Sequence, residues 1–506
     1  MKKNILEQFF ETVEANYSKI AVIEGDKTIT FNDLDQKAQV LASHIIAKTS
    51  LFNMPIAIFL PKSIESVLAD IAITYSCNIY MNIDVKSPRE RIKNIFDLIK
   101  PALVITNSAN LESLNGAIEN DKVLLIDELD FNQEPNGVLL FSRMDLQIDT
   151  DPLCIINTSG STGTPKGVVL NHRSFIEFTQ VSIELFKFSN QEIIGSLSPL
   201  VFDIYSFELC LLMSKGSTLL LIPEQLSAFP IKILELLKQH QVSFIFWVPT
   251  IMVNIANMNL LEAVQLPDLK IIWFAGEVFP TKQFNYWKRM LSNTLFANLY
   301  GPIEITLDCT YFIVNREIAD DEPLPIGIPY RNTDVLILND KDELIKEGEE
   351  GELCVRGTSL AMGYYNNPEK TAAAFVQNPL NISYPEVIYR TGDVVAKNSF
   401  GEIVFKGRKD SIVKHLGYRI ELGEIEHVIV NTLKIAKNGC VVYQIARKEI
   451  TLFYESETEI SPTEFRKQIV CILPKYMIPT VYIRMDEMPR NTNGKIDRLM
   501  LKNQIN

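Results

Sequence analysis

Residues 151–166 read DPLCIINTSGSTGTPK, an apolar run that ends in a turn of glycine, serine and threonine before Lys166 and Gly167. Glycines let the backbone turn its N–H groups toward an anion, the hydroxyls add hydrogen-bond donors, and the lysine supplies a positive charge. The stretch therefore predicts a strand followed by a loop that binds a polyphosphate. It departs from the G-x-x-x-x-G-K-[ST] loop at Pro165 and Gly167. A flexible linker is the alternative, but the loop lies between two apolar runs, where a linker serves no purpose.

Outward from this loop, short apolar runs alternate with longer segments of helical periodicity, such as residues 32–48 and 63–75. This alternation is typical of parallel sheets covered by helices, and it continues to about residue 330. The apolar runs that predict strands are residues 56–60, 102–106, 123–126, 242–248 and 270–274.

After residue 330 the pattern changes to strand-like pieces separated by glycines, at residues 352–355 and 402–405, which favours a more antiparallel, barrel-like subdomain. A second change falls near Asp410, and the remaining residues carry a helix and strand pattern of their own. The sequence therefore predicts an α/β protein with a large N-terminal domain at residues 1–409 and a small α+β domain at residues 410–506.

The chain has 506 residues, of which 47% are hydrophobic and 22% charged, and this composition excludes a disordered chain. The formal net charge of -13 has the wrong sign for a surface that binds phosphate backbones or anionic lipid, so we expect neither nucleic acid nor membrane as partner. Acidic residues interrupt the start of the chain, and no run reaches the roughly 18 apolar residues of a bilayer span. Seven widely spaced cysteines form no CxxC pair. We therefore expect a cytoplasmic protein.

The run TSGSTGTPKG at residues 158–167 resembles the phosphate loop of the adenylate-forming superfamily. This superfamily includes acyl-CoA synthetases, luciferases and the amino-acid adenylation domains of nonribosomal peptide synthesis. Other motifs of the superfamily occur in its order along nearly the whole chain, which leaves little room for chance. They are TFNDL at residues 30–34, FD at 202–203, NLYGPIE at 298–304, GEL at 351–353, YRTGD at 389–393, GRKD at 407–410, GYRIELGEIE at 417–426, LPKYMIP at 473–479 and NGKIDR at 493–498.

The resemblance implies that ATP is a substrate and that Mg²⁺ is a cofactor. Tyr300 would stack on the adenine, Asp393 would accept hydrogen bonds from the ribose hydroxyls, and Arg408 would reach the ribose or a phosphate. Glu304 would help to hold Mg²⁺. The nucleotide-binding residues that the resemblance implies are Thr158, Ser159, Gly160, Ser161, Thr162, Gly163, Asn298, Tyr300, Asp393 and Arg408.

The catalytic residues that the resemblance implies are Lys495, Glu304 and Lys166. Joining a carboxylate to the α-phosphate of ATP brings two anions together, so cations must neutralise them. Lys495 would bridge the substrate carboxylate and the α-phosphate or ribose, because an ammonium offers three donors on a flexible stem. Asp410 would be the hinge about which the small domain rotates, moving Lys495 away and residues 417–421 toward the site for a second, thioester-forming step.

By the same resemblance, Asp203 indicates that the acid is an amino acid. An aspartate at this place pairs with the substrate α-ammonium, a charge that is costly to leave unpaired in a closed pocket, whereas a helix N-cap is the alternative interpretation. The pocket walls are mostly bulky and apolar, so we expect a small neutral side chain: proline first, then alanine of either hand, glycine or serine. Asp308 is the exception among these apolar walls. Two alternatives are open for it: it meets a hydroxyl or second amine of the substrate, or it faces away from the pocket. The pocket residues implied are Asp203, Ile204, Phe207, Phe246, Trp273, Ala275, Leu299, Leu307 and Asp308.

The chain contains neither a G-G-x-S element for phosphopantetheine attachment nor an H-H-x-x-x-D motif. We therefore expect the acceptor thiol to be supplied by a separate acyl or peptidyl carrier protein. Two alternatives remain open: a coenzyme A ligase for a small carboxylic acid, and a non-catalytic nucleotide-binding protein of the same fold. A basic docking face and a solvated run of charges are the two interpretations of Lys406, Arg408, Lys409 and Lys414.

Overall fold

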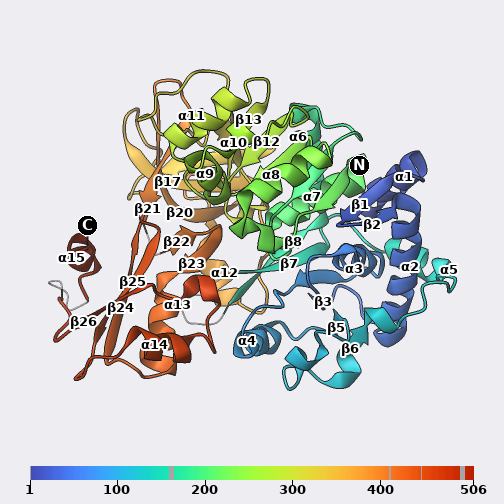
Figure 1. The fold of residues 1–506 in the computed structure, drawn as a ribbon, viewed down its shortest axis with the longest axis horizontal. Helices are drawn as coiled ribbons and strands as arrows, with labels where there is room; N and C mark the ends of the chain where they lie inside the picture. The colour runs from blue at the N-terminus through green and yellow to red at the C-terminus, as the bar shows by residue number, and fades with distance from the viewer. Residues whose placement is uncertain (1, 159–164, 410–411, 446, 491–495, 506) are drawn as a thin grey trace.

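The structure of the protein is a computed structural model that describes residues 2–158, 165–409, 412–445, 447–490 and 496–505. Two helix-covered sheets form most of the molecule, and two smaller parts rich in strands adjoin them on one side (Figure 1). No helix within these ranges is long and apolar enough to cross a membrane.

The first sheet consists of the strands β3 (Pro55–Phe59), β4 (Ile79–Asn82), β5 (Leu103–Thr106), β6 (Val123–Leu125), β7 (Pro152–Thr158), β8 (Lys166–Asn171) and β18 (Gly363–Tyr364). Their order is β18-β8-β7-β4-β3-β5-β6. Strands β7, β4, β3, β5 and β6 are parallel, and β8 runs antiparallel to both of its neighbours. The glycine-rich motif falls between β7 and β8 in the chain, and its residues 159–164 lie outside the described ranges.

The second sheet consists of β1 (Ile20–Glu24), β2 (Lys27–Thr30), β9 (Ile193–Ser196), β10 (Thr218–Leu221), β11 (Phe244–Trp247), β12 (Ile271–Phe274), β13 (Leu295–Tyr300), β14 (Thr310–Ile313) and β15 (Ile328–Pro329). Their order is β15-β14-β13-β12-β11-β9-β10-β1-β2. The strands from β13 to β1 are parallel, whereas β14, β15 and β2 add antiparallel edges.

Helices cover both faces of both sheets. The core between the sheets receives α1 (Leu6–Asn16), α2 (Phe31–Lys48), α3 (Ile64–Tyr75), α5 (Gly137–Met144), α6 (His172–Phe186) and α7 (Asp203–Lys215). The outer face of the first sheet packs on α4 (Arg89–Ile99). The outer face of the second sheet packs on α8 (Pro230–Gln239), α9 (Pro249–Asn257), α10 (Leu260–Ala263) and α11 (Thr281–Met290).

Strand β11 is apolar at every position because both of its faces are buried. Phe244 and Phe246 enter the core between the sheets, while Ile245 and Trp247 enter the core beneath the outer helices. Side chains of a strand alternate between its two faces, so a strand with helices on both sides needs apolar residues throughout. The five runs expected as strands coincide with β3, β5, β6, β11 and β12, and only β3 begins one residue earlier than its run.

Helix α3 lies wholly between the sheets, and every residue from Ser66 to Tyr75 is buried. Ser63 starts the helix with a capping box, in which its side chain accepts from the Ser66 N–H and the Ser66 hydroxyl oxygen accepts from the Ser63 N–H. The loop between β3 and α3 is therefore fixed at both ends, and it carries Lys62.

The remaining large-domain strands form an antiparallel sheet of β16 (Thr333–Leu338), β17 (Glu350–Gly357), β19 (Phe375–Gln377), β20 (Val387–Lys397) and β21 (Ile403–Arg408). Helix α12 (Pro368–Ala374) precedes β19. This is the antiparallel part that the sequence predicts after residue 330.

The C-terminal part contains β22 (Ile412–His415), β23 (Tyr418–Glu421), α13 (Leu422–His427), β24 (Asn438–Gln444), β25 (Glu449–Glu455), α14 (Pro462–Ile469), β26 (Val481–Met485) and α15 (Arg498–Asn503). Strands β22 and β23 form a hairpin, and Leu416 and Gly417 at its turn have positive φ angles of 53° and 83°. Residues from α13, β24, β25 and α14 form a separate apolar core. The expected fold class, an α/β protein with a small α+β C-terminal part, is confirmed.

Candidate active site

Tyr300, Asp393 and Arg408 lie together although 93 residues separate Tyr300 from Asp393 in the chain. Strand β13 ends at Tyr300, and β20 and β21 pair Asp393 with Arg408 across their ladder. The Tyr300 hydroxyl donates to one Asp393 oxygen, and the Arg408 guanidinium donates to the other and to the Thr391 carbonyl at 2.9 Å. Burial, with the nearby Asp393 charge, raises the pKa of Tyr300 well above its ordinary value, so the phenol remains a donor.

Two further residues expected at the nucleotide have structural contacts. Asn298 donates through its side-chain amide to the Pro325 carbonyl at 2.8 Å, which ties β13 to the following loop. Thr158 pairs with Lys166 across the hairpin of β7 and β8. Seven expected site residues lie outside the described ranges: Ser159, Gly160, Ser161, Thr162, Gly163, Asp410 and Lys495.

Glu304 is fully buried in a short 3₁₀ turn after β13. Its Oε1 accepts from the Tyr364 hydroxyl at 2.8 Å, and its Oε2 accepts from Arg419 of β23 at 2.6 Å. Burial alone would raise the pKa of Glu304, but Arg419 and the hydrogen bonds together lower it below its ordinary value. The carboxylate is therefore ionised, as a ligand of Mg²⁺ must be.

A metal ion held by Glu304 would need most of its ligands from elsewhere. The described residues contain no group of three or more His, Cys, Asp or Glu side chains placed to hold a metal. Mg²⁺ commonly takes one or two carboxylates and fills its other positions with phosphate oxygens and water. One buried carboxylate beside the expected nucleotide-binding residues fits that pattern.

Lys166 is also paired with the C-terminal hairpin. Its Nζ lies 2.6 Å from Oε1 of Glu421 in β23 and 5.5 Å from the ring centre of Tyr364. Glu421 and Arg419 are two residues apart on one strand, so their side chains share a face. The same face of β23 therefore contacts both Lys166 and Glu304.

The apolar residues expected around the amino acid belong to one packed cluster. Phe207 of α7 stacks on Trp273 of β12 with ring centres 5.0 Å apart, and Phe246 of β11 meets Trp273 edge-on at 5.4 Å. These rings are almost wholly buried, so little space is left beside them. The cluster contains Ile204, Phe207, Phe246, Trp273, Ala275, Leu299 and Leu307.

Asp203 is the first residue of α7, and the residue at the N-cap is Phe202, so Asp203 is not a helix cap. Its carboxylate accepts a hydrogen bond from the Ile204 N–H at 3.0 Å. Burial raises the pKa of Asp203 to about 6, while the nearby charge of Lys414 opposes the rise.

Asp308 is 3% exposed and lies within electrostatic reach of Asp203. Burial, together with repulsion from Asp203, raises the pKa of Asp308 well above its ordinary value, and Lys414 opposes this. The expected contact of Asp308 with a substrate hydroxyl or second amine stays a prediction. Lys414 of β22 thus interacts with two carboxylates of the pocket.

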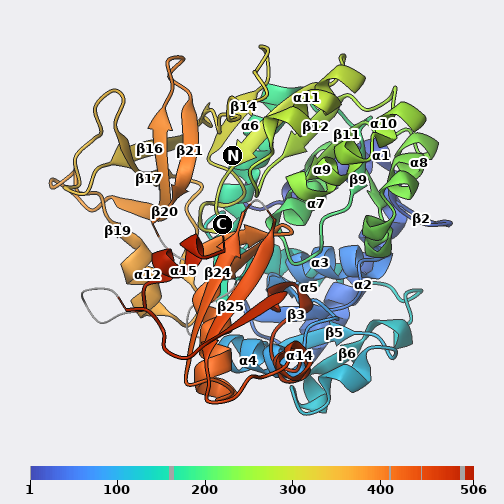
Figure 2. The ribbon, with the colours of Figure 1, turned by 60° about the vertical axis from the view of Figure 1, so that its left-hand side comes forward.

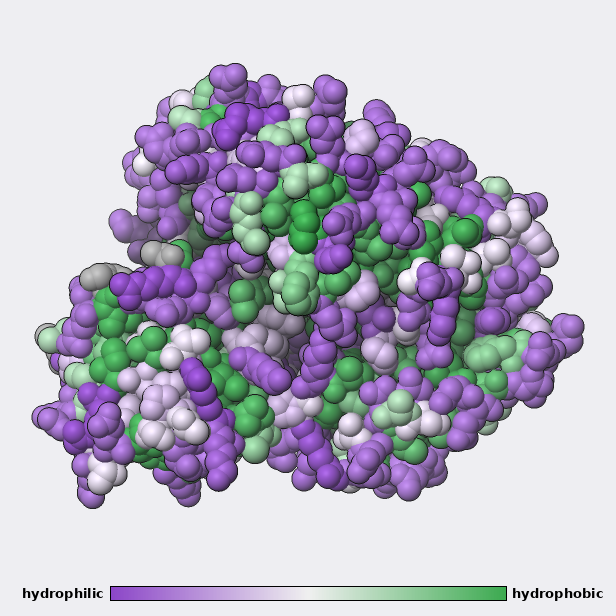
Figure 3. All heavy atoms as spheres, viewed as in Figure 1, coloured by the Kyte–Doolittle hydropathy of each residue, from purple (hydrophilic) through white to green (hydrophobic). Residues whose placement is uncertain are grey.

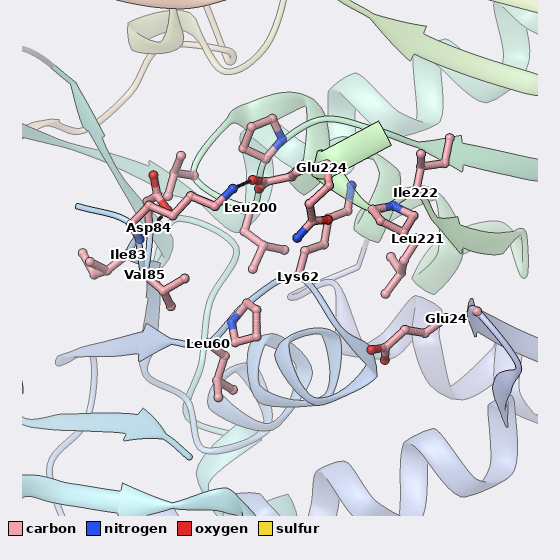
Figure 4. Close-up of a pocket in the computed structure, with 17 residues that line it drawn as sticks. Glu24, Leu60, Lys62, Ile83, Asp84, Val85, Leu200, Leu221, Ile222 and Glu224 are labelled. Carbon is pink, nitrogen blue, oxygen red and sulfur yellow. Dashed lines mark hydrogen bonds and ion pairs between the residues drawn. The ribbon is translucent and has the colours of Figure 1, made fainter. Parts of the chain in front are cut away.

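A cavity of about 210 Å³ opens between the two sheets, beside the segment that leads into Asp203 (Figure 4). Leu60 and Lys62 of the loop before α3, Asp84 after β4 and Leu200 before α7 contribute to its lining. The ion pair between Lys86 and Glu224 lies at this cavity. Figure 3 shows that this face of the molecule is hollowed near its centre.

The C-terminal hairpin lies close to this cavity. The Tyr418 ring contacts the Phe202 ring with centres 4.8 Å apart, and it stacks on Tyr476 at 3.5 Å. Burial raises the pKa of Tyr418, and the nearby charges of Asp84 and Glu224, two lining residues, add to the rise. The cavity therefore lies close to the contact between the hairpin and Phe202, the residue before Asp203.

The site also contains residues that sequence reasoning did not assign. Tyr364 lies in none of the motifs considered, so no signal pointed to it. Arg419 and Glu421 fall within residues 417–421, the segment that the resemblance brings toward the site, but their pairing with Glu304 and Lys166 was not part of that expectation. Arg408 and Lys414 interact with carboxylates of the site, so these two do not add to an outer basic face.

Comparison with known proteins gives the family. The family described as AMP-binding enzyme matches residues 9–365. Zwittermicin A synthase ZmaJ of Bacillus cereus is 30% identical over 510 residues, which covers 99% of this chain and 95% of that protein. Tyrocidine synthase 1 of Brevibacillus parabrevis is 30% identical over 505 residues, and there the chain spans 45% of the relative's length.

Solved structures share the fold. The adenylation domain AlmE of Vibrio cholerae, in complex with glycyl-adenosine-5'-phosphate, superposes with a TM-score of 0.84 at 22% identity over 100% of this chain and 98% of that one. PA1221, an NRPS protein containing adenylation and PCP domains, has a TM-score of 0.84 at 20% identity over 99% and 84%. Because the family match covers more than half of the chain and a relative of similar length is 30% identical, this chain belongs to the AMP-binding enzymes, the adenylate-forming family that its motifs resemble.

Proposed function

We propose that this protein activates a small amino acid with ATP, releases pyrophosphate, and passes the aminoacyl group to the phosphopantetheine thiol of a separate carrier protein. The observation that carries the proposal is Asp203, a carboxylate against an apolar wall whose electrostatic partner is the Lys414 ammonium. Lys414 belongs to the C-terminal part, so its charge can leave with that part. The α-ammonium of an amino acid would then take its place.

In the first step a carboxylate oxygen of the amino acid attacks the α-phosphorus, and the bond to the bridging oxygen breaks to release pyrophosphate. Lys166 would hold the phosphates, and Lys495 would bridge the two reacting anions. Glu304 would hold Mg²⁺, which when bound neutralises phosphate charge and assists pyrophosphate as leaving group. The group formed by Tyr300, Asp393 and Arg408 would bind the nucleoside.

These roles require the C-terminal part to move, with Asp410 as the proposed hinge between residues 1–409 and 410–506. In the structure β23 pairs with both Lys166 and Glu304, the two groups that the phosphates and Mg²⁺ would use. The arrangement described therefore suits the second step, in which pyrophosphate has already left.

In the second step the carrier thiol attacks the carbonyl carbon of the adenylate, a thioester forms, and AMP leaves. The reacting thiol needs a path to the pocket, and the cavity of about 210 Å³ beside Phe202 supports such a path. PA1221, which has the same fold, contains a PCP domain together with its adenylation domain. This likeness supports a carrier protein as the acceptor.

The pocket supports a small side chain, because Phe207, Phe246 and Trp273 fill the space behind Asp203. Proline, alanine and glycine suit these walls but give Asp308 nothing to bind. Serine is equally small and carries a hydroxyl that can hydrogen-bond a buried carboxyl group. Asp308 therefore favours serine among the small amino acids.

The proposal is tested by ATP–pyrophosphate exchange with each common amino acid of both hands. We expect one small amino acid to support exchange, and we expect Asp203→Ala to abolish it. A coenzyme A ligase for a simple carboxylic acid would keep its activity in Asp203→Ala.

We also expect Lys495→Ala to lower exchange on the order of 100-fold or more, the loss seen when other transition-state donors are removed.

A further inference from the structure

Lys62 makes two hydrogen bonds to a segment of backbone far away in the sequence. Its Nζ donates to the Ser196 carbonyl at 2.6 Å and to the Ser198 carbonyl at 2.8 Å. Lys62 lies on the loop between β3 and α3 of the first sheet, whereas Ser196 ends β9 of the second sheet. Figure 4 shows Lys62 among the residues that line the cavity. One side chain therefore ties the two sheets together at the cavity wall.

Glu208 completes this contact from the other side. It lies on α7 and is 0% exposed, and its Oε2 accepts a hydrogen bond from the Ser196 hydroxyl. Burial lowers the pKa of Lys62 to about 8, although Glu208 and Glu224 attract its charge. Both acceptors of Lys62 are carbonyl oxygens, so its Nζ is the donor in each bond.

The segment that Lys62 holds leads directly to the amino-acid pocket. Residues 197–202 connect β9 to α7, and Asp203 is the first residue of that helix. Lys62 fixes the beginning of this segment, and the contact between Ser196 and Glu208 fixes α7 to the end of β9. The carboxylate of Asp203 sits between these two fixed points in the chain.

We propose that Lys62 is a positioning residue for the amino acid: it holds the Ser196 and Ser198 carbonyls and thereby fixes the Asp203 carboxylate where the α-ammonium binds. The inference rests on the proposed function of Asp203. Lys62 itself acts only through this segment. Its loss should therefore weaken binding of the amino acid and leave binding of ATP unaffected, because the nucleotide residues lie on other elements.

Lys62→Met tests the inference because methionine keeps most of the side-chain length and removes the donors. In ATP–pyrophosphate exchange we expect the KM for the amino acid to rise about 10-fold, the effect of losing hydrogen bonds from a charged donor. The KM for ATP should stay within about twofold of wild type. Lys86→Met is the matched control, because Lys86 lines the same cavity but is exposed, and it should change neither constant.

Lys62→Arg keeps the charge and the donors, and it should bring the amino-acid KM back to within about threefold of wild type. A purely structural role would lower the amount of active enzyme and leave both KM values unchanged. An unchanged amino-acid KM in Lys62→Met, or an equal rise in both constants, overturns the inference. If Lys62→Met does not fold, Lys62→Gln is compared with Lys62→Arg, and equal amino-acid KM values overturn it.

The same assay separates this inference from the proposed function. If none of the amino acids supports pyrophosphate exchange by the wild-type enzyme, the proposed function is contradicted. The positioning role of Lys62 is then contradicted as well. Wild-type enzyme that is active, and whose amino-acid KM does not depend on Lys62, contradicts only the positioning role.

Discussion

Asp308 follows a stretch of strained backbone at the proposed amino-acid pocket. Thr306 and Leu307 have φ angles of 55° and 66°, and non-glycine residues in this region cost about 1–3 kcal/mol each. The turn is also tight, because a Cβ on Gly301 would lie 2.1 Å from the Leu307 carbonyl oxygen. Gly301 is thus required where the chain returns on itself. This strained turn leads directly into Asp308, which lies within electrostatic reach of Asp203.

Asp308→Leu should change the substrate preference of the enzyme. If Asp308 receives a side-chain hydroxyl, its replacement should lower exchange with serine by about 10-fold or more, because a site built for a polar group discriminates strongly by it. Exchange with alanine should change by less than about threefold. The measurement is kcat/KM for both amino acids, and an unchanged ratio of the two values contradicts the role of Asp308.

His172 links stability to pH through its burial. The imidazole is 1% exposed, Nδ1 accepts from the Ile5 N–H at 3.4 Å, and Nε2 lies 3.0 Å from the Gln147 amide nitrogen. Burial lowers the pKa of His172 from 6.5 to about 3. Between pH 6.5 and about pH 3, the imidazole is therefore protonated in the unfolded chain and neutral in the folded chain. The stability that neutral His172 provides is fully present above pH 6.5 and is lost as the pH falls toward 3.

We expect His172→Gln to weaken this dependence. The thermal unfolding midpoint of the variant should fall less steeply than that of wild type as the pH decreases from 6.5. His240→Gln serves as control and should follow wild type, because His240 is partly exposed. Equal slopes for His172→Gln and wild type would show that His172 does not contribute.

The β22–β23 hairpin is the element that joins the small part to the candidate active site. Arg419 and Glu421 lie on one face of β23 and pair with Glu304 and Lys166, and Lys414 of β22 interacts with the pocket carboxylates. The hairpin turn packs closely on the large part, because a Cβ on Gly417 would lie 3.1 Å from Cγ1 of Val248. The position of the hairpin therefore determines which charged groups lie next to Lys166, Glu304 and the carboxylates of the candidate site.

Glu421→Gln should let ATP compete better with the hairpin for Lys166. The variant removes the carboxylate that pairs with Lys166, and a partly buried ion pair of this kind is worth on the order of 1 kcal/mol. We expect the KM for ATP in exchange to fall about threefold and aminoacyl transfer to a carrier protein to slow. Glu457→Gln, an exposed change in the same part, should alter neither. A higher KM for ATP in Glu421→Gln would contradict competition at Lys166.

The secondary structure of the large part follows well from the sequence, whereas the hairpin contacts do not. Strands such as β11 and β12 are buried on both faces, so their apolar runs mark them clearly. Glu304 and Lys166 can be identified through motifs. Their pairing with Arg419 and Glu421 depends on how two parts that are distant in the chain meet, and no local periodicity encodes that arrangement.

At the scale of the molecule, the small part contacts both sheets of the large part. Arg91 of α4 pairs with Glu424 of α13 at 2.8 Å, and the two side chains are 9% and 0% exposed. Both ribbon views place α4 beside the C-terminal part (Figures 1 and 2). On the other side, Lys448 donates to the Thr250 hydroxyl at 2.9 Å and the Gly417 N–H donates to Glu277 at 2.7 Å.

Arg91→Met should loosen the small part without affecting the first step. The change removes the Arg91 guanidinium from a buried ion pair between the two parts, and breaking such a pair from one side costs several kcal/mol. We expect ATP–pyrophosphate exchange to stay within about twofold, transfer to a carrier to fall about 10-fold, and hydrogen exchange of β22 and β23 to quicken. Unaltered hydrogen exchange of the hairpin would show that this pair does not hold the two parts together.

The pairing of β23 with Lys166 and Glu304 has a consequence for turnover. A lysine and a glutamate that are engaged by a protein strand are unavailable to a new nucleotide, so a molecule cannot discharge one aminoacyl group while loading another. Under the proposed function, the steps must follow each other in time, and surplus ATP would delay delivery to the carrier by keeping the strand out. The two ion pairs would thus determine the order of the two steps in the catalytic cycle.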